Sequence, residues 1–258
     1  MNDISQNIES VYKADLPKLK SYLYRLTCEK EIVNDIANDT FLKALEKKHT
    51  FNGSSSLKTW IFSIATRTAI DYLRKKKRWP ENAQDEARKL AESDNKYSNE
   101  FIRINNESTA GAFEVKEHIN FCFTCISKTL PIEQQISLIL KDIYGFKVDE
   151  ISSILGCPKG TSKHRLFEAR KKMNHIFERR CALVNKNGVC YQCSELDDYF
   201  NPKKKKEQIN LQSENSGDKE DYYTLRAQLV KAIDPLESKG NKLEESIMQV
   251  LRRAIDDK

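Results

Sequence analysis

The stretch that decides the fold reads DEISSILG over Asp149–Gly156, continues through a Cys-Pro pair, and then reads KGTSKHRLFEARKK over Lys159–Lys172. The apolar spacing over residues 148–155 predicts a short helix, the glycine and proline predict a tight turn, and residues 160–177 predict a longer helix. A short helix, a turn with glycine and a longer basic helix are typical of the helix-turn-helix, whose second helix enters the major groove of DNA.

Basic side chains are concentrated on two parts of the chain. Residues 159–172 hold six lysines and arginines against Glu168 alone, and residues 67–78 hold six against Asp71 alone. One run of charge is usually a solvated helix face, but two runs, each attached to a structured motif, indicate a chain that binds a polyanion at two separate places. The net charge of +6 agrees with this interpretation without deciding it.

The composition predicts an all-α protein of two small helical domains joined by a linker, with a helical C-terminal extension. Glycine and proline are scarce, at 8 and 6 of 258 residues, and apolar residues recur at helical spacing. No apolar run approaches the roughly 20 residues that span a bilayer, and the opening Met1-Asn2-Asp3 resembles no signal peptide. We therefore expect a cytoplasmic protein without membrane insertion.

The first part of the chain predicts three helices, over residues 8–28, 31–48 and 57–77. Pro17 interrupts the first, which is therefore either one kinked helix or two. The third helix carries Trp60 in line with Arg67 and Arg74. An indole aligned with arginines suits base stacking and phosphate contact, but Trp60 packed against a neighbouring helix explains the pattern equally well.

The pattern along the chain predicts five parts. Residues 81–112 are polar and poorly periodic, which indicates a linker, and apolar residues at helical spacing after residue 221 predict a helical hairpin. The expected division is a first helical domain over residues 1–80, a linker over 81–112, the helix-turn-helix domain over 113–180, a cysteine-containing extension and linker over 181–220, and the C-terminal hairpin over 221–258.

Several of these segments resemble a known family, the extracytoplasmic-function (ECF) sigma factors of bacterial RNA polymerase. The resemblance to their region 2 lies in DIANDTFLKAL over residues 35–45, FNG over 51–53, SLKTWIFSIA over 56–65 and DYLRK over 71–75. The resemblance to their region 4 lies in Leu130-Pro131 and in residues 149–151, 154–156 and 160–170.

The resemblance implies a specificity subunit that directs RNA polymerase core to promoters, recognises two promoter elements and helps to melt DNA. Region 2 would bind the polymerase through Asp35, Asn38, Asp39 and Phe41. The residues implied in DNA binding are Asn52, Ser54, Ser55, Trp60, Arg67, Arg74, Lys75, Lys76, Lys77 and Arg78 in region 2, and Lys159, Thr161, Lys163, His164 and Arg165 in region 4. Polymerase core and promoter DNA are the expected partners, an anti-sigma factor is a further candidate, and no catalytic site is expected.

Region 4 departs from the family pattern at three positions. Ser162 replaces a small aliphatic residue, His164 replaces a serine, and Glu168 stands where a basic residue is common. The competing class is a stand-alone helix-turn-helix regulator, responsive to a metal or to redox state, that never joins the polymerase. The Trp60 helix and the acidic residues at 35–39 argue against it, because a simple repressor needs neither.

Two C-x-x-C pairs flank region 4, and the family pattern does not explain them. Cys122 and Cys125 precede it, and Cys190 and Cys193 follow it. Four thiolates brought together make a tetrahedral zinc site, so zinc is the candidate cofactor. Three alternatives stay open: buried core cysteines, a thiol redox switch, and Cys181 as a replacement ligand.

Overall fold

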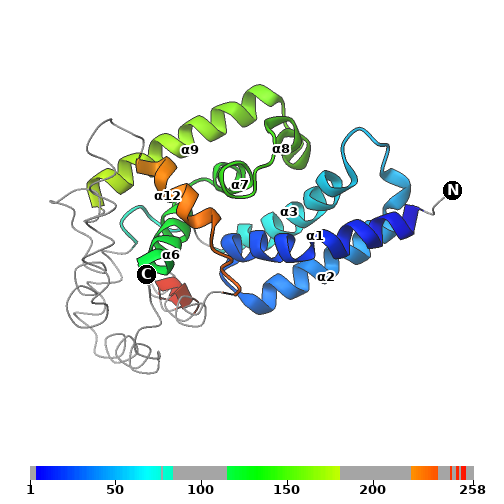
Figure 1. Ribbon diagram of the computed structural model, residues 1–258, viewed down its shortest axis with the longest axis horizontal. Coiled ribbons are helices and arrows are strands. Elements are labelled where there is room, and N and C mark those ends of the chain that lie inside the picture. The colour runs from blue at the N-terminus through cyan, green and yellow to red at the C-terminus, as the bar shows by residue number, and fades with distance from the viewer. Residues whose placement is uncertain are drawn as a thin grey trace. The chain divides into compact units, whose positions relative to one another are not determined.

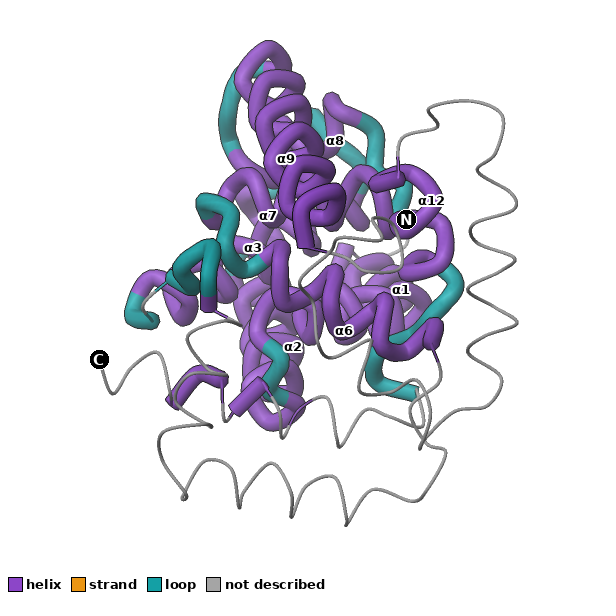
Figure 2. Tube along the Cα trace, turned by 90° about the vertical axis from the view of Figure 1, so that its left-hand side faces the viewer, coloured by secondary structure: helices purple, strands orange, loops and turns teal. Residues whose placement is uncertain are grey.

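The computed structural model describes residues 4–76, 78–83, 115–180, 222–237, 245, 248–249 and 251–253, and every regular element among them is a helix (Figures 1 and 2). The predicted all-α class is therefore confirmed. The helices are α1 (Ile4–Thr27), α2 (Lys30–Glu46), α3 (Leu57–Arg74), α6 (Val115–Ser127), α7 (Ile132–Leu138), α8 (Val148–Leu155), α9 (Lys159–Arg180) and α12 (Tyr222–Lys231), with the short 3-10 helix η1 (Lys48–Thr50) and the short π-helix η2 (Ile139–Ile143).

Local chemistry sets the helix boundaries. Pro17 lies inside α1, which stays one helix. Ser56 begins α3, because its hydroxyl accepts the backbone N–H of Thr59 at 3.1 Å and so satisfies one of the first-turn donors. Gly145 ends the turn after η2 with φ of 74°, and Gly156 ends α8 in the left-handed conformation with φ of 61°, which glycine adopts without steric cost.

The contacts divide the chain into two compact units that do not follow chain order. One contains Met1–Lys77 and Pro131–Ala169, and the other contains Arg78–Leu130 and Arg170–Lys258. The five-part division expected from the sequence stays a prediction. The first unit combines residues from before and after the expected linker at 81–112. The reason is that apolar side chains far apart in the sequence bury one another.

In the first unit, α1, α2 and α3 pack together, and α8 packs on α3. Ile8, Ala44 and Ile64 form a buried cluster between the first three helices. The ring of Phe146, which precedes α8 and is only 3% exposed, lies 4.9 Å from the ring of the fully buried Phe62 in α3. This aromatic pair fixes the start of α8 against α3.

In the second unit, the C-terminal extension packs onto the rest of the chain. Phe123 of α6 lies 6.5 Å from Phe177 of α9 and 6.1 Å from Tyr223 of α12, measured between ring centroids. Trp79 is 3% exposed, and the cations of Lys128 and Arg252 lie 5.7 and 5.5 Å from its ring. The extension thus contributes apolar and cation–π contacts to this unit.

Candidate nucleic-acid and polymerase interfaces

The helix-turn-helix is held by polar contacts across its turn. The backbone N–H of Cys157 donates to the carbonyl of Ser152 at 3.0 Å. The hydroxyl of Ser152 donates to that of Ser162 at 3.0 Å, and the Ser162 hydroxyl also lies 3.3 Å from the Cys157 sulfur. Ser162 is fully buried, so these contacts satisfy a hydroxyl that would otherwise cost free energy in the core. They explain how a serine fits where the family has an aliphatic residue.

The first half of α9 presents only part of its predicted DNA-binding set to solvent. Lys163 and His164 are exposed. Lys159 is exposed but forms an ion pair with Asp149 at 2.8 Å, and Thr161 is half-buried. Arg165 is half-buried and donates to the Cys157 sulfur at 3.3 Å, so its side chain points to the turn between α8 and α9. Lys163 and His164 therefore remain the predicted residues that face outward.

An aromatic residue that the sequence reasoning did not select lies on the same outward face of α9. Phe167 is 62% exposed. It follows Lys163 by four residues and His164 by three, a spacing that places residues on one side of a helix. That spacing was the signal in the sequence, but an apolar residue in a periodic helix is ordinarily read as core.

The loop before α3 and the outer side of α3 form the second predicted DNA surface. Asn52 and Ser54 are exposed, Ser55 is half-buried, and the side-chain oxygen of Asn52 accepts the N–H of Ser54 at 3.0 Å. Arg67 and Arg74 are exposed. The loop therefore presents short polar side chains at the start of α3, and the two arginines lie further along the same helix.

Trp60 differs from these exposed residues. It is half-buried, packs against the cluster of Ile8, Ala44 and Ile64, and lies 5.4 Å from the ring of Phe51. The packing interpretation of Trp60 is the one that these contacts favour, although part of the indole stays accessible.

The basic segment at the end of α3 is largely engaged within the protein. Lys76 donates to the carboxylate of Glu29 and lies over the ring of Tyr72. Burial alone would lower the pKa of Lys76, but hydrogen bonds to Glu29 and Tyr72 and the charge of Glu29 raise it overall, so Lys76 stays charged. Arg78 donates to the carbonyl of Leu130. Lys75 is exposed, and Lys77 lies outside the described residues.

The predicted polymerase-binding helix α2 carries an outward polar face. Asp35, Asn38 and Asp39 are exposed and share this face. Phe41 instead points inward, with its ring 4.8 Å from that of Tyr12, and the exposed apolar residue is Leu42, which is 64% accessible. Adjacent helix positions differ by about 100°, so only one of two neighbouring apolar residues faces the core.

A groove between α2 and α3 adjoins this face. Its volume is about 550 Å³, and acidic, basic and apolar side chains mix along it. The lining residues are Ile32, Asp35, Ile36, Asn38, Asp39, Leu42, Lys43, Thr68, Asp71, Tyr72 and Lys75.

Comparisons with known proteins place these surfaces in a family. Residues 11–79 match the family model of Sigma-70 region 2, and residues 121–173 match that of Sigma-70, region 4. Two proteins named ECF RNA polymerase sigma-E factor, from Salmonella typhimurium (strain LT2) and Escherichia coli (strain K12), are each 29% identical over 145 residues, or 55% of this chain and 72% of theirs. Both regions and these relatives support an ECF sigma factor.

Another similar protein is RNA polymerase sigma factor YlaC of Bacillus subtilis (strain 168). It is 29% identical over 174 residues, which cover 65% of this chain and 90% of YlaC. A solved structure of the sigma factor RpoE in complex with the anti-sigma factor NepR, from Bartonella quintana, has a TM-score of 0.44 at 20% identity and covers 69% of this chain and 98% of RpoE. This sigma factor directs RNA polymerase core to promoter DNA, and the stand-alone regulator is not favoured. Among the described residues, no helix is both long and apolar enough to cross a membrane.

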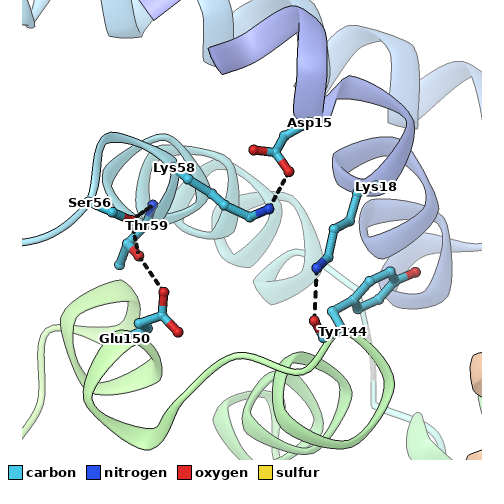
Figure 3. A network of polar contacts seen from close by, with 7 residues as sticks. All are labelled: Asp15, Lys18, Ser56, Lys58, Thr59, Tyr144 and Glu150. Atoms are coloured by element: carbon cyan, nitrogen blue, oxygen red, sulfur yellow. Dashed lines mark hydrogen bonds and ion pairs between the residues drawn. The ribbon is translucent and has the colours of Figure 1, made fainter.

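Polar contacts connect region 2 of the sigma factor to the start of its helix-turn-helix (Figure 3). Lys18 donates to the carbonyl of Tyr144 at 2.8 Å, and the hydroxyl of Thr59 donates to the Glu150 carboxylate at 3.2 Å. The other oxygen of that carboxylate accepts the backbone N–H of Lys147 at 2.8 Å. Glu150 therefore caps α8 and bonds α3 at the same time.

The cysteines of the sigma factor are only partly described. Cys122 and Cys125 are buried in α6, 8% and 2% exposed. Cys181, Cys190 and Cys193 lie outside the described residues. Within the part of the chain that the structure describes, no group of three or more potential metal ligands occurs. The predicted zinc site is therefore untested.

Proposed function

We propose that three surfaces carry out the work of this sigma factor. The outward face of α9 with Lys163 and His164 reads the upstream promoter element. The loop at residues 52–55, with Arg67 and Arg74, holds the melted element nearest the start site. The α2 face with Asp35, Asn38, Asp39 and Leu42 binds the polymerase core. The observation that carries the proposal is the outward, basic first half of α9 within a capped helix-turn-helix.

The assignment to the upstream element rests on the geometry of α9. Residues near the N-terminus of a recognition helix reach the base edges, and Lys163 and His164 are the exposed cationic and titratable side chains there. Phosphate neutralisation supplies affinity, while contacts to base edges supply specificity. Glu168, which is half-buried, would repel phosphate if it faced DNA.

The assignment of the melting surface rests on its polarity. Extruded bases are held by stacking and by charge along the backbone, and exposed Arg67 and Arg74 supply that charge along the helix that follows the polar loop. The accessible part of Trp60 adds an aromatic edge next to the same loop.

The polymerase surface combines an apolar anchor with a charged rim. Leu42 is exposed beside Asp39, whose carboxylate pairs with Lys43 at 2.8 Å. Interfaces commonly place a desolvated anchor within polar surroundings, and exposed rim charges steer the encounter. We expect the sigma factor to act in the cytoplasm, where RNA polymerase works, and to have no catalytic activity of its own.

Runoff transcription tests the proposal. The full chain is combined with core polymerase and a library of promoter fragments, and promoter-specific starts are expected. Lys163→Ala combined with His164→Ala should abolish selection of the upstream element while core binding persists. A protein that binds duplex DNA but produces no promoter-specific start with any core polymerase would instead be a regulator.

We also propose that Cys122, Cys125, Cys190 and Cys193 bind one zinc ion. The support is the spacing of the two pairs and the position of the first two sulfurs three residues apart on α6, which places them on one helix side. Metal analysis of protein purified under reducing conditions should find about one zinc per chain, and a chelator should lower the thermal midpoint. Less than a tenth of an equivalent of zinc per chain, with a thermal midpoint that the chelator leaves unchanged, would contradict the site.

An anti-sigma factor is a further proposed partner on family grounds alone, with co-purification as its test.

A further inference from the structure

The C-terminal extension contacts a tryptophan at the end of region 2. Trp79 is the last residue that matches the region 2 family model, and it is 3% exposed. Two cations lie over its ring, Lys128 of region 4 at 5.7 Å and Arg252 of the extension at 5.5 Å from the ring centroid. The region 4 family model ends at residue 173, well before Arg252. One indole therefore joins the end of region 2, the start of region 4 and a segment that neither family model includes.

The chain on both sides of the expected linker is held at this place. Arg78 donates to the carbonyl of Leu130, and Glu81 pairs with Arg179 of α9 at 3.0 Å. Glu81 and Arg179 are 39% and 53% exposed, and exposed ion pairs contribute little, whereas a cation over a buried indole contributes more. The strongest of these contacts is thus the set of Trp79, Lys128 and Arg252, which we call the clasp.

The closed clasp leaves one polar group unpaired. The indole N–H of Trp79 has no hydrogen-bond partner in the part of the chain that the structure describes, although a buried indole N–H usually has one. An unpaired buried donor costs free energy, which contact with water would recover. Arg252 is only half-buried, so water can reach the indole when this side chain moves away. The cation–π contacts that close the clasp are therefore opposed by the unpaired N–H.

The closed clasp also removes the linker from the reach of the chain. The linker expected at residues 81–112 spans up to roughly 100 Å when it is fully extended. With Lys128 over the Trp79 ring, the two ends of the linker are held together, and its length adds nothing to the separation of regions 2 and 4. Elements that are read from one side of a duplex lie one helical turn, about 34 Å, or a multiple apart. A chain that binds two promoter elements needs the linker length that the closed clasp withholds.

We propose that the C-terminal extension is an intramolecular inhibitor, which keeps the clasp closed through Arg252 until regions 2 and 4 bind both promoter elements. This inference goes beyond the proposed function and rests on it for the consequence at the promoter. When the binding-competent form is a minor fraction of the protein, the apparent affinity falls by that fraction. Weakening the clasp should therefore raise promoter affinity, whereas losing a contact that merely supports the fold should not.

Tryptophan fluorescence of the full chain tests the clasp without polymerase or DNA. The chain has two tryptophans, so Trp60→Phe leaves Trp79 as the one emitter. In this background, Arg252→Ala should shift the emission to longer wavelength and raise its quenching by acrylamide. Arg252→Lys keeps a cation over the ring and should change both less. Lys231→Ala, which removes an exposed cation of the extension, is the matched control and should change neither.

Promoter affinity tests the inhibition. The sigma factor bound to core polymerase is titrated with a promoter found by runoff transcription, and with the same fragment after its upstream element is scrambled. Arg252→Ala should raise affinity for the two-element promoter roughly fivefold, equivalent to about 1 kcal/mol for one cation–π contact. Affinity for the scrambled fragment should stay unchanged, because a single element requires no separation of the two regions. Lys231→Ala should leave both affinities unchanged.

Three results would overturn the proposal. Unchanged emission and quenching in Arg252→Ala would show that Arg252 does not close the clasp. An unchanged or reduced affinity for the two-element promoter would leave Arg252 with a packing role. An equal gain on both fragments would show that the gain does not depend on separating the regions. A chain that gives no promoter-specific start would instead overturn the proposed function, and the Trp79 emission would still decide whether Arg252 closes the clasp.

Discussion

Asp39 and Glu9 occupy similar local settings on different helices, which makes one the control for the other. Asp39 is 52% exposed and pairs with Lys43 at 2.8 Å, while Glu9 is 51% exposed and pairs with Lys13 at 2.6 Å, both four residues apart on a helix. Exposed pairs of this kind contribute little to stability. If the two charges are reversed to lysine, any difference in polymerase affinity between the Asp39 and Glu9 variants therefore reflects a direct effect on binding and not a loss of stability.

Asp35→Lys and Asp39→Lys should each weaken binding to core polymerase by roughly tenfold, because a reversed rim charge opposes the complementary charge of the partner. Glu9→Lys should leave binding unchanged, and all three should keep the thermal midpoint. Titration of labelled sigma factor with core polymerase measures the affinity. Equal affinity for the Asp35 and Asp39 variants would remove this face from the interface.

Substitutions at Arg74 and Trp60 should affect DNA melting and protein stability to different extents. Arg74→Ala should reduce open-complex formation more than duplex binding and leave stability unchanged, because Arg74 is exposed. Trp60→Ala should impair melting as well, but it should also lower the free energy of unfolding by roughly 2 kcal/mol, since the half-buried indole packs on the core. Permanganate footprinting and chemical denaturation measure the two effects. Normal melting by the Trp60 variant would leave the indole with packing alone.

Single residues also show where sequence reasoning ends. Asp35, Asn38 and Asp39 lie on an exposed polar strip, which can be read from the spacing on an amphipathic helix, while their contact with polymerase stays a prediction. Phe41 stays a predicted polymerase contact; its ring packs against Tyr12, and the strongly exposed apolar residue beside it is Leu42, which the sequence reasoning did not select. The engagement of Lys76 and Arg78 was not predicted, because their partners lie 47 and 52 residues away.

At the scale of elements, local signals were sufficient for most boundaries. The predicted helix over residues 148–155 is α8 itself, and the predicted glycine turn after it begins at Gly156. The packing of α8 on α3 could not be predicted, because it depends on Phe62 and Phe146 meeting across 84 residues of chain.

Gly156 offers a test of the turn in the helix-turn-helix. Its φ is 61°, and a Cβ atom added there would meet nothing within 4 Å. Gly156→Ala should therefore destabilise the protein by about 1 kcal/mol through backbone strain alone. Gly156→Asn should cost less, because asparagine adopts the left-handed conformation more readily. Urea denaturation compares the variants, and an equal loss for both would point to a cause other than backbone conformation.

At the scale of the whole molecule, both compact units are built from two separate segments. Residues 1–77 pack with 131–169, and residues 78–130 pack with 170–258. The pairing of these distant segments could not be predicted, because composition changes mark linkers but carry no record of which segments pack together.

This arrangement predicts the behaviour of a cut chain. A specific protease site inserted between residues 84 and 114 should, once cleaved, yield two fragments that co-elute on gel filtration. The contacts that would hold them include the Phe62–Phe146 ring pair and the ion pair of Glu81 with Arg179 at 3.0 Å. Separate elution of the fragments would show that these contacts do not persist in solution.

The carboxylate of Glu150 has a consequence for hydrogen exchange. It accepts the Lys147 amide with one oxygen and the Thr59 hydroxyl with the other, beside the buried ring of Phe146. A movement that separates α8 from α3 must break the hydrogen bond between Thr59 and Glu150 and expose the Phe146 ring to water. We expect the first turn of α8 to open in the same event. Deuterium uptake at the Lys147 amide should then rise when polymerase or promoter DNA is added, while uptake at the Thr59 amide, which donates to Ser56 at the start of α3, should not change. The exchange rate of the Lys147 amide would then report how often α8 separates from α3.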